Sequence, residues 1–203
     1  ESKVMAAAMS SQTDITALTS DNGLSYTWDF HTGNLDSTAL KDWQSGKVYA
    51  IDLGTGLSGL NLGKAKLKVL SVNESEYQIQ FATLASTSFQ TFTIPKSATT
   101  GFTYFSMSNG GAVIDLEPNK ETWDLLFTNY CHVFDEHTPY SVVGILSNRY
   151  GVKVQEVTIP FATLKHSDIV ESAFEDRINV IGYDWKTYDF DNGTYTIHSN
   201  RTF

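Results

Sequence analysis

Short alternating segments, separated by turn-forming residues at close intervals, constrain the fold of this 203-residue chain more than any other feature. Between residues 47 and 95, segments of β-forming residues follow one another with no stretch of helical periodicity between them. The connections at 72–76 and 85–87 have the length and composition of hairpin loops. The pattern therefore predicts a β-meander rather than alternating strands and helices. The predicted strands are Lys47–Leu53, Lys64–Val72, Tyr77–Leu84 and Ser88–Ile94.

The rest of the chain carries further strand signals and one helix signal. Asp168, with Glu171 three residues later, forms a capping-box pattern before apolar pairs at i,i+4, which predicts a short helix near residues 168–176. Residues 1–22 show weak periodicity and predict an N-terminal arm with some helical content. We therefore expect a mostly β fold, with a single antiparallel β domain, meander- or sandwich-like, over residues 23–203. Further strands are predicted at Leu24–Phe30, Tyr104–Ser106, Ala112–Leu116, Tyr140–Leu146, Lys153–Ile159, Asn179–Tyr183 and Thr194–His198.

Residues 121–132 form the segment that is richest in aromatic and apolar side chains. A period of two places Trp123, Leu125 and Phe127 on one face, and the opposite face also carries apolar side chains. Such a strand is typical of the centre of a sheet that is covered on both sides. We expect Trp123, Leu125 and Phe127 to be buried in the core. An alternative interpretation directs Tyr130 and His132 into a pocket.

Composition excludes several classes of protein. The net charge is −9 with only 14 Lys and Arg residues and no basic stripe, which argues against nucleic acid as a partner. No run approaches 18 apolar residues, so no transmembrane segment is expected. The single cysteine, Cys131, excludes an intramolecular disulfide framework, and the fold must depend on its core.

No catalytic motif is recognisable, so an enzyme is the least favoured class. The chain has no nucleophile elbow, phosphate loop, dinucleotide fingerprint or His-Glu-x-x-His pair. Cys131 and His132 are adjacent in a predicted strand, where neighbouring side chains point to opposite faces and cannot form a nucleophile–base pair. Asp189–Gly193 resembles a calcium loop, but its spacing fits a hairpin turn better.

Histidine and methionine remain as candidate binding residues. His137 and His166 lie in predicted loops, where binding groups gather on a rigid β scaffold. Met107 lies close to a predicted turn and offers a thioether, and His132 lies within the predicted central strand.

Ordered segments of residues 101–203 resemble the HmuY-like haem-binding proteins. The most characteristic piece is Trp123–Tyr130, where Trp-Asp is followed by apolar residues and a tyrosine. Residues 1–100 carry no such resemblance. The matching segments are Tyr104–Ser106, Asn109-Gly110, Val113–Leu116, Trp123–Tyr130, Tyr140–Asn148, Ile181–Lys186 and Tyr195–Phe203.

The resemblance implies an all-β, exported protein that is anchored by lipid at the outer-membrane surface of Gram-negative bacteria or released from it. It also implies haem as the ligand and an outer-membrane receptor as the partner that receives it. Haem-binding members of the family place an axial ligand shortly after a C-terminal tryptophan, whereas residues 186–191 here contain no His or Met. Weak or five-coordinate binding is therefore expected. The family pattern also continues beyond a residue like Phe203, so we expect the C-terminal strand or strands to be missing from this chain.

Two hypotheses remain for the function. The chain is a haem-binding surface protein, with His137, His166, Met107 and His132 as candidate ligands. Alternatively, it is a non-haem ligand-binding or adhesion module of the same fold, because a fold does not determine a function.

Overall fold

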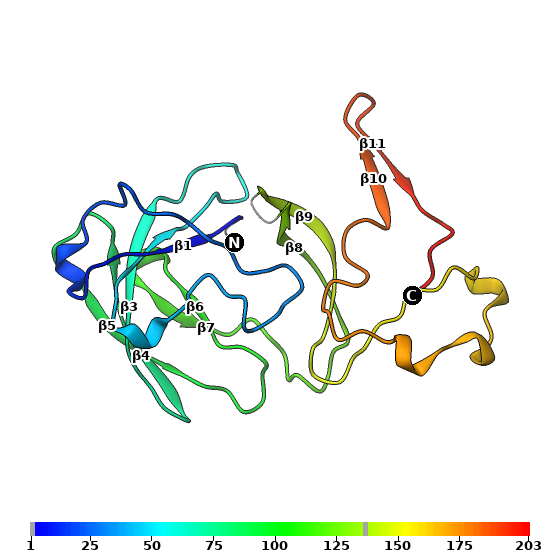
Figure 1. Cartoon of the computed structure of the whole chain (residues 1–203), viewed down its shortest axis with the longest axis horizontal. Coiled ribbons are helices and arrows are strands. Elements are labelled where there is room, and N and C mark those ends of the chain that lie inside the picture. Colours follow the sequence, from blue (N-terminus) through cyan, green and yellow to red (C-terminus); the bar gives the residue numbers. More distant parts are fainter. Residues whose placement is uncertain (1–2, 136–137) are drawn as a thin grey trace.

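A computed structural model describes residues 3–135 and 138–203 (Figure 1). The described chain is mostly β, with antiparallel sheets, and this confirms the predicted fold class. The largest sheet has five strands in the order β1-β2-β3-β4-β5, and each strand from β2 onward pairs with the one before it. Its strands are β1 (Ala6–Met9), β2 (Tyr49–Asp52), β3 (Lys64–Val72), β4 (Glu76–Thr83) and β5 (Gln90–Pro95).

The five-stranded sheet buries side chains on both faces. On one face Tyr49, Leu67 and Phe81 lie opposite one another in register and belong to one apolar cluster. On the other face Val48 and Ala50 pack against Ile15 and Leu18 from the N-terminal segment. Alternating residues of this strand thus enter two different cores, which explains the apolar run Val48–Ile51.

The N-terminal segment is part of this sheet rather than a separate arm. Ala6–Met9 pairs antiparallel with β2, and Ala6, Ala7 and Ala8 are buried. The only helical content described in this segment is the short 3-10 turn η1 (Ile15–Ala17), whose Ile15 is buried. Three consecutive buried alanines give no alternating pattern, so weak periodicity could not indicate this strand.

Three two-stranded sheets follow (Figure 1). The longest is a hairpin with ten paired positions, from Leu125 opposite Ser147 to Phe134 opposite Thr138. The last hairpin turns at residues 190–193, as predicted for the segment that resembles a calcium loop. The pairs are β6 (Tyr104–Ser106) with β7 (Ala112–Ile114), β8 (Leu125–Phe134) with β9 (Thr138–Ser147), and β10 (Lys186–Asp189) with β11 (Thr194–Ile197).

The predicted central strand is wrong in its surroundings. Within the described chain β8 pairs with β9 alone, and on one face Leu125 is 43% and Phe127 73% exposed. Trp123 precedes the strand and is only partly buried. The prediction took apolar composition as evidence of burial, but folded proteins leave much apolar surface exposed when no layer covers it.

The helix predicted near residues 168–176 is also wrong. The chain instead forms separate 3-10 turns with extended residues Ile169 and Val170 between them. Ile169, Val170 and Phe174 are all exposed, so no packed face stabilises a helix of this length. The 3-10 turns after η1 are η2 (Trp43–Ser45), η3 (Ser108–Gly110), η4 (Phe161–Thr163), η5 (His166–Asp168) and η6 (Glu171–Ala173).

Three predicted strands are reduced to isolated bridges. The segments 24–30, 153–159 and 179–183 pair with other chain segments at single positions only. Within the described residues, none of these segments runs alongside another strand for several residues. Each therefore forms backbone hydrogen bonds only at the isolated bridges. The bridges are Ala7–Thr27, Val154–Glu175, Val157–Thr202 and Ile145–Gly182.

Within the described chain, no helix has the length and apolarity needed to span a membrane.

Candidate functional site

A cavity of about 530 Å³ lies between the five-stranded sheet and the β8–β9 hairpin. One wall is formed by β1 and by residues 28–40, and the other by Asn129–Cys131 of β8. We call it the inter-sheet cavity. Its volume falls within the range of about 300–1,000 Å³ that is usual for small-molecule and cofactor sites.

Four types of side chain that can hold haem iron line the inter-sheet cavity. They are contributed by segments far apart in the sequence: the loop after Trp28, the turn after β6, and the middle of β8. These residues are His31, Met107, Tyr130 and Cys131.

His31 forms a stack with His132 beside this cavity. The two ring centroids are 3.9 Å apart, and the His132 ring also lies 4.6 Å from Phe134 and 4.9 Å from Tyr183. Burial lowers the pKa of His31, and His132 and Arg177 lower it further. Burial also lowers the pKa of His132, against an opposing effect of Asp184. Both imidazoles are therefore neutral at pH 7.

The hydrogen bonds of the two imidazoles differ. Nδ1 of His31 accepts a bond of 3.4 Å from the backbone N–H of Val133, so Nε2 carries the proton in this tautomer. Nδ1 of His132 is buried and has no hydrogen-bond partner in the described chain. The stack therefore contains one buried nitrogen whose hydrogen-bonding capacity is unused.

Tyr130 and Cys131 are poorer candidates for an anionic ligand. Burial, followed by Tyr183 and Asp184, raises the pKa of the Tyr130 hydroxyl, and burial raises the pKa of the Cys131 thiol. Both groups are protonated at pH 7. His31 and Met107 are thus the neutral donors that the inter-sheet cavity offers without loss of a proton.

Two basic side chains line the inter-sheet cavity among the described residues, Lys3 and Arg149. The guanidinium of Arg149 donates a hydrogen bond of 2.9 Å to the carbonyl of Gly33 and lies 5.0 Å from the ring of Phe102. These contacts hold a positive charge at the wall of a largely apolar space.

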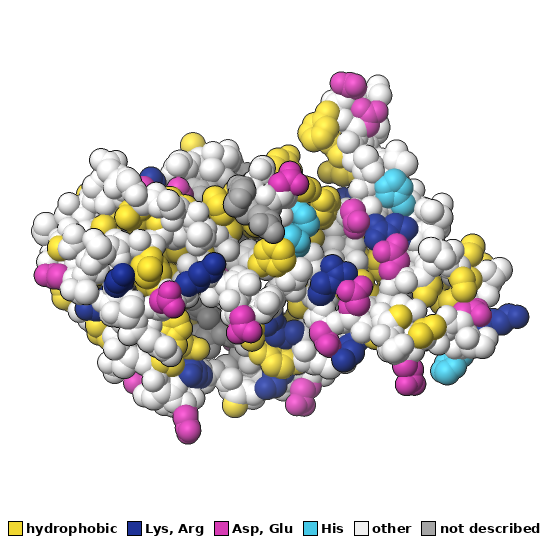
Figure 2. All heavy atoms as spheres, viewed as in Figure 1, with side chains coloured by type: hydrophobic (Ala, Val, Ile, Leu, Met, Phe, Trp, Pro, Cys, Tyr) yellow, Lys and Arg dark blue, Asp and Glu magenta, His cyan; other side chains and the backbone are white. Residues whose placement is uncertain are grey.

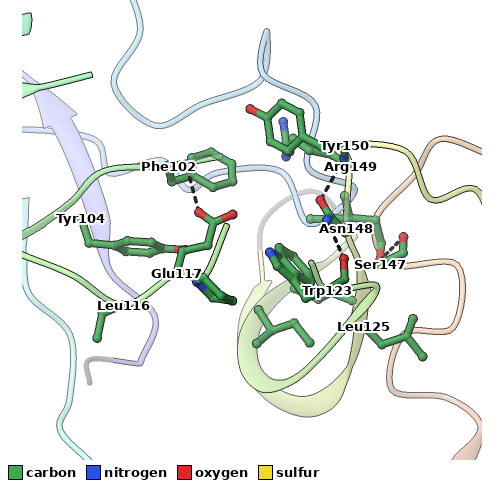
Figure 3. Close-up of a pocket in the computed structure, with 14 residues that line it drawn as sticks. Phe102, Tyr104, Leu116, Glu117, Trp123, Leu125, Ser147, Asn148, Arg149 and Tyr150 are labelled. Carbon is green, nitrogen blue, oxygen red and sulfur yellow. Dashed lines mark hydrogen bonds between the residues drawn. The ribbon is translucent and has the colours of Figure 1, made fainter. Parts of the chain in front are cut away.

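A second cavity, of about 300 Å³, adjoins the first (Figure 3). Phe102, Leu146, Arg149 and Ile178 line both spaces and therefore form the partition between them. We call the second space the Trp123 pocket. Its remaining lining residues are Tyr104, Leu116, Glu117, Pro118, Trp123, Leu125, Leu126, Ser147, Asn148 and Tyr150.

Hydrogen bonds to backbone groups hold the Trp123 pocket in shape (Figure 3). Both carboxylate oxygens of Glu117 accept backbone N–H bonds, from Gly101 at 3.0 Å and Phe102 at 2.8 Å. The side-chain amide of Asn148 donates to the carbonyls of Lys120 at 2.6 Å and Trp123 at 2.7 Å. By contrast, the buried indole N–H of Trp123 has no acceptor in the described chain. An unpaired buried donor of this kind costs about 1–3 kcal/mol.

The predicted site residues are only partly brought together. Met107 lines the inter-sheet cavity, and His132 contacts His31, which lines it as well. His166 is exposed in η5 and lines neither cavity. His137 lies outside the described residues.

Sequence reasoning missed His31 as a site residue. It follows Trp28 and Phe30 at the start of a polar loop, and these aromatic neighbours were the available signal that the loop packs against the protein. The partner that makes His31 notable, His132, is about a hundred residues away in the sequence, so the pair could not be inferred from spacing. Comparison with protein-family models, curated proteins and solved structures finds no match to this chain.

Proposed function

We propose that this protein is a non-catalytic, exported haem-binding protein that takes haem into the inter-sheet cavity. The observation that carries the proposal is that the neutral donors His31 and Met107 line one cavity of about 530 Å³. Haem is the ligand implied by the resemblance of residues 101–203 to HmuY-like proteins. Haem brings its own iron. The protein has to supply a cavity for the ring, an axial ligand for the iron and positive charges that pair with the haem carboxylates.

The residues of the inter-sheet cavity fit these requirements. Binding of iron through Nε2 of His31 needs the proton on Nδ1, which gives up the bond from Val133 N–H. That bond is 3.4 Å long and therefore weak, so the exchange loses little. Met107 is the second neutral donor, and Arg149 and Lys3 carry the charge that pairs with the haem carboxylates.

Location and partner follow from the same resemblance. The protein would act at the outer-membrane surface of a Gram-negative bacterium, anchored by lipid or released, and would pass haem to an outer-membrane receptor. His31 lies in a loop and Met107 in a turn, so each donor can leave the iron separately. Such a site suits the transfer of haem to a receptor better than a rigid bis-histidine site would.

Hemin titration with absorption spectroscopy tests the proposal. The parent protein should show a saturable, shifted Soret band. His31→Ala should weaken binding by about tenfold or more, since loss of even an outer-shell partner of a metal site costs about 10–100-fold. Met107→Ala should alter the band and weaken binding less.

His166→Ala is the matched control, because this histidine is exposed and lines neither cavity. It should bind hemin like the parent. His137→Ala, tested separately, reports on the loop histidine outside the described residues. Absence of saturable binding in the parent, or parent-like binding by a folded His31→Ala protein, would overturn the proposal.

A second candidate function rests on the β10–β11 hairpin. Tyr188 lies 5.0 Å from Phe190 and 4.8 Å from Tyr195 between ring centroids, and Phe190 is 79% exposed. Apolar side chains are visible at the tip of this hairpin in Figure 2. An exposed aromatic cluster of this type favours a glycan- or peptide-binding adhesion module. Binding on a glycan or peptide array that Tyr195→Ala removes, without change in hemin binding, would establish this second function.

A further inference from the structure

The five-stranded sheet has two edges, and the described chain covers only one of them. β1 is covered by Thr27, whose N–H donates to the carbonyl of Ala7 at 2.9 Å and whose carbonyl accepts from the N–H of Ala7 at 3.0 Å. β5 pairs with β4, and no backbone segment of the described chain pairs with its other side. This free edge lies at the side of the sheet that is remote from β8 and β9 (Figure 1). An uncovered edge is a template for pairing with another strand.

The ladder between β4 and β5 shows which backbone groups of β5 point outward. The N–H of Lys96 donates to the carbonyl of Ser75 at 2.7 Å, one position beyond the last pair of this ladder. Hydrogen-bonded and non-hydrogen-bonded pairs alternate along an antiparallel ladder. Counting back from Lys96, the N–H and C=O of Phe92 point toward β4, and those of Thr91 and Thr93 point outward.

Pro95 is consistent with this assignment, and it marks the end of the free edge. Counted in the same way, its backbone nitrogen points outward, which is the position in a sheet that a residue without an N–H can occupy. Its carbonyl accepts a hydrogen bond of 2.7 Å from the hydroxyl of Thr103. Thr91 and Thr93, both exposed, therefore offer two N–H and two C=O groups that have no backbone partner in the described chain.

We propose that this protein forms a homodimer in which β5 of one copy pairs antiparallel with β5 of a second copy about a two-fold axis. Thr91 lies opposite Thr93 of the partner subunit, and Phe92 lies opposite Phe92 of the partner subunit. Each copy then satisfies both N–H and both C=O groups, so four hydrogen bonds join the two sheets into one. β5 does not line the inter-sheet cavity, so this dimer is independent of the proposed binding of haem.

β5 is suited to pairing with itself because it carries no charged side chain. Its sequence is Gln-Thr-Phe-Thr-Ile-Pro, so two-fold pairing places no like charges opposite each other. Phe92 packs on the apolar cluster of the sheet, and its pairing with a second Phe92 would extend that cluster across the dimer. On the opposite face, pairs of Thr91 with Thr93 are a favourable cross-strand combination. A strand from an unrelated protein would match the backbone groups alone, whereas a second copy also matches these side chains.

The parent protein itself gives the first test. Sedimentation velocity over a concentration series up to about 1 mM should show a reversible shift from monomer to dimer, because one short strand forms a small interface. Amide exchange followed by NMR should slow at Thr91 and Thr93 as the concentration rises. The amide of Phe92 is bonded to β4 in both states and should change little. A monomer at every concentration, or unchanged exchange at Thr91 and Thr93, would overturn the proposal.

Charged variants test the register of the pairing. Thr91→Lys/Thr93→Lys places like charges opposite each other at two positions, so dimerisation should weaken about tenfold. The added lysines reduce the net charge of −9, so overall repulsion between copies cannot explain a weaker dimer. Thr91→Glu/Thr93→Lys places opposite charges across the same positions and should dimerise at least as tightly as the parent. Thr194→Lys/Thr196→Lys, at exposed positions of β11, is the matched control and should dimerise like the parent.

Two results with the variants would contradict the proposal. One is a folded Thr91→Lys/Thr93→Lys protein that dimerises with the parent's affinity. The other is a folded Thr91→Glu/Thr93→Lys protein that remains monomeric, because a different register would place its glutamates or lysines opposite one another. The amide measurement on the parent decides the question even if the variants fail to fold. None of these measurements uses hemin, so their failure would leave the proposed haem site untouched.

Discussion

At the scale of single residues, buried polar side chains connect segments that the apolar core does not reach. Asn148 is the clearest case, because its side chain binds the carbonyls of Lys120 and Trp123 and the N–H of Tyr150. Lys66 performs a similar role in the five-stranded sheet. It is fully buried, and its ammonium group donates to the carbonyls of Leu18 and Ser86 at 2.6 and 2.5 Å.

Replacement of Asn148 tests how much such a connection contributes. Asn148→Ala leaves two carbonyls and one N–H without their partner in a buried place. At about 1–3 kcal/mol for a buried unsatisfied group, partly relieved by water, the free energy of unfolding should fall by about 2–4 kcal/mol. Urea denaturation measures the loss. Asn129→Ala, at an exposed strand position, should stay within about 0.5 kcal/mol of the parent. A similar small loss at Asn148 would contradict the connecting role.

The stacked histidines make stability depend on pH. Burial lowers the pKa of both His31 and His132 below the usual imidazole value of 6.5. Between the folded-state pKa and 6.5 the unfolded chain binds more protons than the folded one, so stability rises with pH in this window. The stability that comes from keeping these histidines neutral is fully present above pH 6.5. It is lost as the pH falls from 6.5 through the folded-state pKa values of the two histidines. Arg177 strengthens the effect at His31, and Asp184 weakens it at His132.

Urea denaturation of the parent and of His132→Phe at pH 7.5 and 5.0 measures this dependence. Phenylalanine preserves an aromatic ring in the stack and removes one titrating group. The loss of stability between the two pH values should therefore be smaller in His132→Phe than in the parent. His166→Phe, which alters an exposed histidine, should leave the pH dependence unchanged. An equal loss in the parent and His132→Phe would show that the stack does not titrate as described.

At the scale of elements, the meander and the strands of the β8–β9 hairpin could be predicted from the sequence, but the exposure of β8 could not. The bounds of β2–β5 lie within two residues of the prediction because these strands have turn residues on both sides. β2, β3 and β4 also bury apolar side chains, so periodicity reports their packing directly. For β8, the same apolar signal arises from a strand whose Leu125 and Phe127 face solvent. Sequence composition does not show whether another layer covers a face.

The candidate site shows the same limit. Met107 was a candidate because of its place near a turn, and it lines the inter-sheet cavity, although its role in binding stays a prediction. The stack of His31 on His132 depends on how the loop after Trp28 folds against β8, which no local pattern encodes. The helix predicted near residue 168 is wrong for a related reason, because Ile169, Val170 and Phe174 all remain exposed and none enters the buried core.

Two phenylalanines on different sheets should lose very different amounts of stability on truncation. Phe81 of β4 is 5% exposed within the first apolar cluster, so Phe81→Ala should lower the free energy of unfolding by about 3–5 kcal/mol. Phe127 of β8 is 73% exposed, so Phe127→Ala should cost less than about 1 kcal/mol. Urea denaturation of both variants gives the comparison. A large loss for Phe127→Ala would mean that a partner or further chain covers this face in solution.

At the scale of the whole molecule, the stabilising core is concentrated in the N-terminal half. Both buried apolar clusters belong to the five-stranded sheet and the residues packed on it. Beyond Gly151 the described chain buries only a few apolar side chains, such as Val154 and Val180, and its pairing consists of isolated bridges and the short β10–β11 hairpin. The side of the protein that carries β10 and β11 is also set apart from the large sheet (Figure 1).

Because the buried apolar side chains are concentrated in the N-terminal half, we expect the backbone to open locally more often in the C-terminal part. Backbone amides exchange with solvent through local openings, whose free energy is low where few buried apolar contacts hold a segment. In hydrogen–deuterium exchange followed by mass spectrometry, peptides from β2, β3 and β4 should exchange last. Peptides from residues 151–203 should exchange much earlier, because their opening exposes little apolar surface that is not already in water. Peptides from β8 and β9 should be intermediate: ten paired positions join these strands, but one face is largely uncovered. Equally slow exchange in β10–β11 and in β3 would contradict this order, because protection so strong requires a covering layer that the described residues do not provide there.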